Sequence, residues 1–285
     1  MKITLLKQIM LYCLGLALPF AVIAQNSLNH KTTAPVLILP APNEGEAKDD
    51  ESLPPDMYLP GLDYQSGKDW WALSCGDDTD ADADTNTCKI TPSVLKVSRS
   101  PFSPYGSSMD SDPIEGQKLH WLPGPPVGTL LMFKFNPTAK LVKPTAGPVE
   151  TYYYPVKDKD IFRKNTLGMT ESELVMPNGI KAQLLPVLVL PNSKDKVVGD
   201  QLSNLLTLEL RIGAKRQTLI KNGFSAYNQD YLAWAGDLDS DGKLDLLINT
   251  GSCSNEKNIA LFLSSLAKPD ELLGEAGRFE EDKGC

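Results

Sequence analysis

Short runs of branched aliphatic residues recur along the C-terminal half of the chain, separated by turns. Residues 184–190 and 205–212 form two such runs, and a Gly-Ala-Lys-Arg turn at 213–216 leads into a third at 217–220. A short turn between apolar runs is typical of a β-hairpin. Further strands are expected at residues 231–235, 244–249, 258–263 and within 272–280. Short connections between successive strands favour an antiparallel meander over parallel βαβ units.

The N-terminal half has the same character, with many prolines between the runs. Short strands are expected at residues 70–73, 90–97, 130–135 and 151–154. Prolines are frequent between residues 99 and 148, which excludes long helices there. Residues 161–175 are the one region with a helical pattern, and it is weakly periodic. We therefore predict an all-β fold of antiparallel meander sheets, sandwich-like or partly propeller-like.

The beginning of the chain has the composition of an export signal followed by a leader. Lys2 and Lys7 precede an apolar run at residues 9–23 and a small residue, Ala24, as in a secretory signal peptide spanning residues 1–24. Residues 25–68 are rich in proline and acidic residues, which predicts a disordered leader. The rest divides into an N-terminal β region, 69–155, and a C-terminal β region, 156–285. No membrane span is expected in the mature chain, since no other run is long enough.

The charge balance narrows the range of partners. The formal net charge is −8, and loss of residues 1–24 removes two lysines and no acids. The formal net charge therefore moves from −8 to −10 in the mature chain. A nucleic acid needs Lys and Arg to neutralise its phosphates, so we expect no nucleic-acid partner. Divalent cations and basic partners suit an acidic surface better.

Asp237, Asp239 and Asp241 stand on alternate positions, followed by Gly242 and a fourth aspartate at 245, which is typical of a calcium loop. Calcium takes about six to eight oxygen ligands, and side chains on every second residue of a curling loop can point inward together. Gly242 permits the sharp turn that brings the next carbonyl to the ion. The expected ligands are the side chains of Asp237, Asp239, Asp241 and Asp245 and the carbonyl of Lys243. Without a cation, neighbouring carboxylates about 4 Å apart repel by about 4 kcal/mol at the dielectric of a protein surface.

The flanking residues distinguish between families of calcium loop. An EF-hand is disfavoured because Ile248 stands at the twelfth loop position, where an EF-hand has a glutamate, and strand-like segments flank the loop. The pattern Asp-x-Asp-x-Asp-Gly-x-x-Asp resembles the calcium loop of FG-GAP or VCBS-type repeats, found in integrin alpha-chain propellers and many bacterial secreted proteins. The resemblance covers the stretch around residues 237–245, in one copy. It implies the same five ligands. The alternative is an Asp-Gly hairpin loop that holds no metal.

The cysteines point to an oxidising compartment. Four of the five lie after residue 24, and an even count in an exported chain favours two disulfides among three possible connectivities. The expected pairs are Cys75–Cys88 and Cys253–Cys285. Zinc is the weaker alternative, because there is no Cys-x-x-Cys or neighbouring histidine.

A second run of alternate aspartates lies between the first pair of cysteines. Its members are Asp78, Asp80, Asp82 and Asp84. It lacks the glycine turn, so a solvated acidic loop is favoured over a second cation site.

Signals for catalysis are sparse. The chain has two histidines, His30 and His120, and it has no Gly-x-Ser-x-Gly elbow, phosphate loop or His-Glu-x-x-His motif. The four tryptophans are more often core residues than sugar platforms; they are Trp70, Trp71, Trp121 and Trp234. We expect a secreted, periplasmic or extracellular calcium-binding protein that acts as a non-enzymatic binding or envelope-associated module for a protein or glycan partner. The alternative is a secreted or periplasmic glycan hydrolase whose acidic pair the sequence does not single out.

Overall fold

The computed structural model describes most of the chain after residue 33. The ranges are 34–40, 57–59, 64–76, 88–102, 114–124, 126, 128–154, 161–164, 169–189, 206–221, 231–251 and 258–280. All of them belong to one compact unit, Ala34–Cys285. The elements bounded within these ranges are antiparallel strands and the short 3-10 turn η6 (Ser264–Leu266). The predicted all-β, antiparallel fold is confirmed.

Eleven strands form one large sheet. Its main order is β1, β6, β3, β4, β7, β13, β14, β15, β16, and β4 also pairs with β5, which in turn pairs with β2. The bounds are β1 (Val36–Pro40), β2 (Met57–Leu59), β3 (Gly67–Cys75), β4 (Cys88–Phe102), β5 (Ile114–Leu122), β6 (Thr129–Phe135), β7 (Gly147–Tyr153), β13 (Leu232–Asp237), β14 (Asp245–Asn249), β15 (Ile259–Leu263) and β16 (Gly274–Phe279).

The two ends of this strand order meet, so the sheet is nearly closed into a barrel. β16 lies against β1 at Gly277, where an added Cβ atom would stand 2.2 Å from the carbonyl oxygen of Val36 and 3.3 Å from the side chain of Ile38. Only a glycine allows two backbones to approach this closely. The seam between the first and last strands therefore depends on Gly277.

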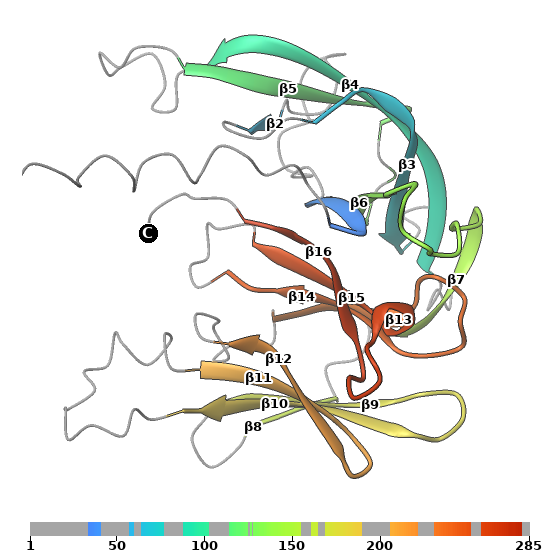
Figure 1. The fold of residues 1–285 in the computed structure, drawn as a ribbon, viewed down its shortest axis with the longest axis vertical. Helices are drawn as coiled ribbons and strands as arrows, with labels where there is room; N and C mark the ends of the chain where they lie inside the picture. The colour runs from blue at the N-terminus through green and yellow to red at the C-terminus, as the bar shows by residue number, and fades with distance from the viewer. Residues whose placement is uncertain are drawn as a thin grey trace, which may run out of the picture. The chain divides into compact units, whose positions relative to one another are not determined.

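A second, five-stranded sheet packs against β13, β14 and β15 of the large sheet (Figure 1). Its order is β12, β11, β10, β9, β8. The bounds are β8 (Phe162–Lys164), β9 (Thr170–Val175), β10 (Lys181–Leu188), β11 (Leu206–Ile212) and β12 (Lys215–Lys221). The predicted hairpin with its turn after residue 212 is confirmed, since β11 and β12 pair across Gly213 and Ala214.

Two hydrophobic cores lie on opposite faces of β14 and β15. Leu247 and Leu261 belong to the core of the large sheet, whereas Leu246 and Phe262 belong to the core shared with the five-stranded sheet. Strands that are buried on both faces have continuous apolar sequences instead of alternating ones. This explains the runs Leu-Leu-Ile and Ile-Ala-Leu-Phe-Leu in β14 and β15. The two cores hold the end of the β13–β14 hairpin in place.

Two predictions about the elements were wrong. Residues 161–175, which had a weak helical pattern, contain strands β8 and β9. Thr170, Ser172 and Leu174 are buried and alternate with less buried residues, so the period of two prevails. Residues 25–68 were expected to be disordered, but Val36–Pro40 form β1 and pair with β6. The apolar run at 36–40 is short, so the average composition of the acidic, proline-rich stretch around it did not reveal the strand. The predicted export signal at 1–24 lies outside the described residues.

The predicted division at residue 155 does not separate two sheets. β7, which belongs to the first predicted region, pairs with β4 on one side and with β13 on the other. Because β13 belongs to the second region, one continuous sheet includes strands of both.

Candidate metal centre

The aspartate-rich loop connects β13 to β14 as a tight hairpin. Asp237 ends β13 and Asp245 begins β14, with Gly236 paired to Asp245 across the hairpin. Gly236 must be small, because an added Cβ atom would lie 2.3 Å from the Glu150 carbonyl oxygen on β7. Gly242 has a φ of 80°, which is the positive backbone dihedral expected for the turn. The pairing of β13 with β14 therefore holds Asp237 and Asp245, at the two ends of the loop, close to each other.

Three carboxylates of the loop converge. Asp237, Asp239 and Asp245 each offer one oxygen, and these oxygens all lie within 4.8 Å of one another. The three residues are 8%, 2% and 0% exposed, respectively. The Oδ1 atom of Asp239 is buried and has no hydrogen-bond partner. An unsatisfied buried acceptor costs about 1 to 3 kcal/mol, and a cation bound by this oxygen would remove that cost.

Backbone amides orient the other two members of the group. Asp237 accepts hydrogen bonds from the amides of Asp241 and Gly242, each at 2.9 Å. Asp245 accepts one from the amide of Leu238 at 2.7 Å and one from the amide of Ser264 at 2.8 Å. Charge-assisted hydrogen bonds of this kind fix the direction of each carboxylate. The positions of these two side chains thus follow from the folded loop itself.

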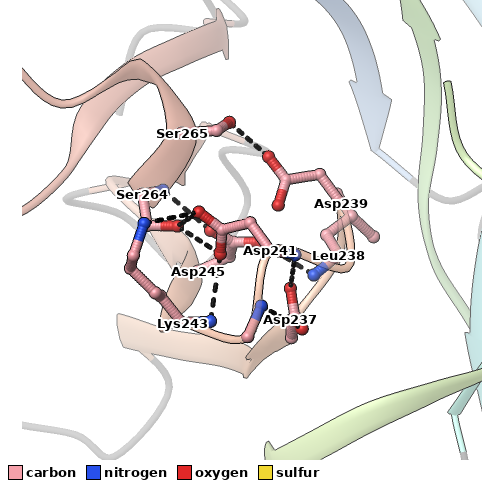
Figure 2. Close-up of polar contacts among 9 residues, drawn as sticks. Asp237, Leu238, Asp239, Asp241, Lys243, Asp245, Ser264 and Ser265 are labelled. Atoms are coloured by element: carbon pink, nitrogen blue, oxygen red, sulfur yellow. Dashed lines mark hydrogen bonds and ion pairs between the residues drawn. The ribbon is translucent and has the colours of Figure 1, made fainter. Parts of the chain in front are cut away.

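Asp241 is not one of the three converging carboxylates. Its carboxylate accepts hydrogen bonds from the Ser264 hydroxyl at 2.8 Å and from the Lys243 amide at 3.0 Å, and it forms an ion pair with the Lys243 ammonium at 3.1 Å (Figure 2). Of the four predicted side-chain ligands, the structure therefore brings three together and engages the fourth with neighbours. The carbonyl of Lys243 stays a predicted ligand.

The site is electrostatically strained when it holds no cation. Burial raises the pKa of Asp245 well above its ordinary value, and the charge of Asp239 raises it further. Burial also raises the pKa of Asp239, although its hydrogen bond from Ser265 opposes the shift. Both shifts mean that the ionised carboxylates are disfavoured where they lie. A divalent cation would stabilise the ionised forms and reverse this effect.

Sequence reasoning missed two residues of the site. Ser264 and Ser265 form the start of η6, which follows β15. The amide of Ser264 reaches Asp245, and the hydroxyl of Ser265 donates a hydrogen bond to Oδ2 of Asp239. Nothing in the local sequence signals this role, because the contact spans 26 positions and depends on how β14 and β15 pair.

The other candidate residues have mixed outcomes. A disulfide joins Cys75 and Cys88, as predicted, at facing positions of β3 and β4. Trp70, Trp121 and Trp234 are buried, which confirms the core interpretation for them. Several predicted residues lie outside the described ranges; they are Cys253, Cys285, His30, Asp78, Asp80, Asp82 and Asp84.

Comparison with known proteins adds no family assignment. The sequence matches no protein-family model, and the searches of curated proteins and of solved structures found no match either. Among the described residues, no helix has the length and apolar character needed to cross a membrane.

Proposed function

We propose that this chain is an exported calcium-binding β protein, in which the ion stabilises the β13–β14 hairpin of a non-enzymatic binding or envelope-associated module. The observation that carries the proposal is the unpartnered Oδ1 atom of Asp239, buried beside the carboxylates of Asp237 and Asp245. The ammonium of Lys243 forms its ion pair with Asp241, which is not one of these three carboxylates. A divalent cation fits the negative charge of the three.

The donor atoms favour calcium over other metals. All three groups supply carboxylate oxygens, which are ligands for hard cations, whereas structural zinc sites use cysteine and histidine. Magnesium keeps several waters and demands a near-octahedral shell, while calcium accepts flexible shells rich in protein oxygens. The Asp-x-Asp-x-Asp-Gly spacing supports the same choice.

The proposal of export rests on observations outside the metal site. The basic and apolar start of the chain suits an export signal, and the Cys75–Cys88 disulfide suits an oxidising compartment.

The hydrolase alternative requires two available carboxylates across a cleft. A pocket of about 340 Å³ has Glu271 and Glu275 on its wall, but each forms an ion pair, with Lys268 at 3.5 Å and with Arg278 at 2.7 Å. No specific observation therefore favours the hydrolase.

Calcium titration of the mature chain tests the proposal. After treatment with a chelator, isothermal titration calorimetry should show one calcium ion bound, with a dissociation constant at or below about 1 mM, the range of extracellular modules. Magnesium at the same concentrations should bind much more weakly. Asp245→Asn should abolish calcium binding, while Asp270→Asn, which removes an exposed charge in the turn after η6, should not. A wild-type protein that takes up no calcium under these conditions would refute the proposal.

A further inference from the structure

We propose that η6 forms the second half of the cation site and that Ser265 is the residue that positions Asp239 for the ion. This inference rests on the proposed function, because it concerns the same site. It extends the site beyond residues 237–245 to a segment that no loop motif includes. The ion would then tie the β13–β14 hairpin to the connection between β15 and β16.

The contacts of η6 are directed at the acidic side chains. Ser265 donates its hydroxyl to one oxygen of Asp239, and the Ser264 amide donates to one oxygen of Asp245 at 2.8 Å. The Ser264 hydroxyl also bonds the carboxylate of Asp241 at 2.8 Å. Two consecutive residues therefore contact three of the four aspartates of the loop. Figure 2 shows the two serines facing the loop from one side.

The bond from Ser265 determines which way Asp239 presents its charge. A carboxylate has two oxygens, and in Asp239 the hydroxyl of Ser265 engages Oδ2 while Oδ1 is buried without a partner. In Figure 2 the second oxygen is turned away from Ser265, toward the loop. Without the hydroxyl, Asp239 would lose the hydrogen bond that engages Oδ2, and with it one restraint on its orientation. Ser265 thus acts through Asp239, as the outer groups of metal sites act through the ligands they orient.

Ser265 is a suitable position for substitution. It is exposed, whereas Ser264 is 7% exposed and bonds through its backbone as well as its hydroxyl. Ser265→Ala removes the hydroxyl and little else, and Ser265→Thr restores it with one extra methyl group at the surface. Ser98→Ala, at an exposed position of β4, is the matched control.

The experiment measures calcium affinity of the four proteins by calorimetry, together with hydrogen exchange of the wild type with calcium and with chelator. We expect Ser265→Ala to weaken calcium binding by about 10- to 100-fold, the usual effect of losing a group that orients a ligand. Ser265→Thr should recover most of the affinity, and Ser98→Ala should retain all of it. Calcium should slow the exchange of amides in residues 264–267 as well as in residues 238–244.

The outcomes separate this inference from the proposed function. If the wild type binds calcium and Ser265→Ala binds it equally well, the role of Ser265 is wrong. If calcium protects only residues 238–244, η6 is not part of the site, and this measurement holds even if the alanine variant fails to fold. A wild type that binds no calcium would refute the proposed function itself. An affinity loss in Ser265→Ala that threonine does not recover would also contradict the role of the hydroxyl.

Discussion

Replacing Asp239 with asparagine should change stability in opposite directions with and without calcium. The amide has nearly the same shape as the carboxylate, and its oxygen can still accept the hydroxyl of Ser265. The substitution removes one of three negative charges whose oxygens lie within 4.8 Å of one another. In chelator it should stabilise the protein, because the repulsion falls. In calcium it should destabilise the protein, because a ligand is lost.

The stability gained by Asp239→Asn in chelator can be estimated from Coulomb's law and from the cost of protonating an aspartate. Two unit charges 4.8 Å apart repel by about 3.5 kcal/mol at an effective dielectric constant near 20. The penalty at pH 7 cannot exceed about 4 kcal/mol, because an aspartate with an ordinary pKa near 3.9 can take up a proton at that cost. The new amide is itself a buried donor, so we expect Asp239→Asn to gain about 1 to 3 kcal/mol in chelator.

In calcium the wild type should be more stable than Asp239→Asn, the reverse of the order in chelator. At about 100 times the dissociation constant, a bound ion adds about 2.7 kcal/mol to the stability of the wild type. Asp239→Asn should lose most of that increment. Urea unfolding followed by tryptophan fluorescence, in chelator and in calcium, measures both quantities. Asp270→Asn, at an exposed turn position, is the control and should show the calcium response of the wild type.

Two results would refute this reasoning. A loss of stability in chelator would show that the three carboxylates do not repel one another appreciably, through protonation or rearrangement of the loop. An unchanged calcium increment in Asp239→Asn would show that the ion binds elsewhere.

Three other predictions test how the fold around the site is stabilised. Gly236→Ala should destabilise the protein by about 3 kcal/mol or more in urea unfolding, because its Cβ would clash with the backbone of β7, whereas Gly242→Ala has open space and should cost about 1 kcal/mol through its positive φ. Replacing Cys75 and Cys88 with serine should lower the unfolding free energy by about 3 kcal/mol, since the disulfide closes a short loop. Burial raises the pKa of Tyr231, so the folded protein keeps this phenolic proton above about pH 10, where the unfolded chain loses it. Stability should therefore fall as pH rises above 10, and less steeply in Tyr231→Phe, as measured by urea unfolding at several pH values.

Much of the strand content could be predicted from the sequence. The runs at β10, β11, β14 and β15 are recognisable because branched aliphatic residues are dense there and turn residues separate them. The region 161–175 was misread, since its short strands are held by packing of Phe162 against Tyr153 and Tyr231. β1 was missed for a similar reason, because its stability comes from pairing with β6 and from burial of Val36.

The loop between β13 and β14 likewise has features that local sequence predicts and features that depend on tertiary contacts. Alternate aspartates and the glycine at the turn are local features, so the sequence alone identified the loop and the positive φ of Gly242. The different position of Asp241 is not local, since its partner Ser264 lies 23 residues away.

By itself, the sequence determined an antiparallel β protein with an acidic hairpin loop, because hydrophobic periodicity and turn chemistry act over short distances. Only the tertiary structure decided which carboxylates converge, which one keeps an unpartnered oxygen, and which serines reach them. Those contacts depend on the pairing of β14 with β15 and on burial between two sheets, and neither is encoded in the spacing of the loop residues.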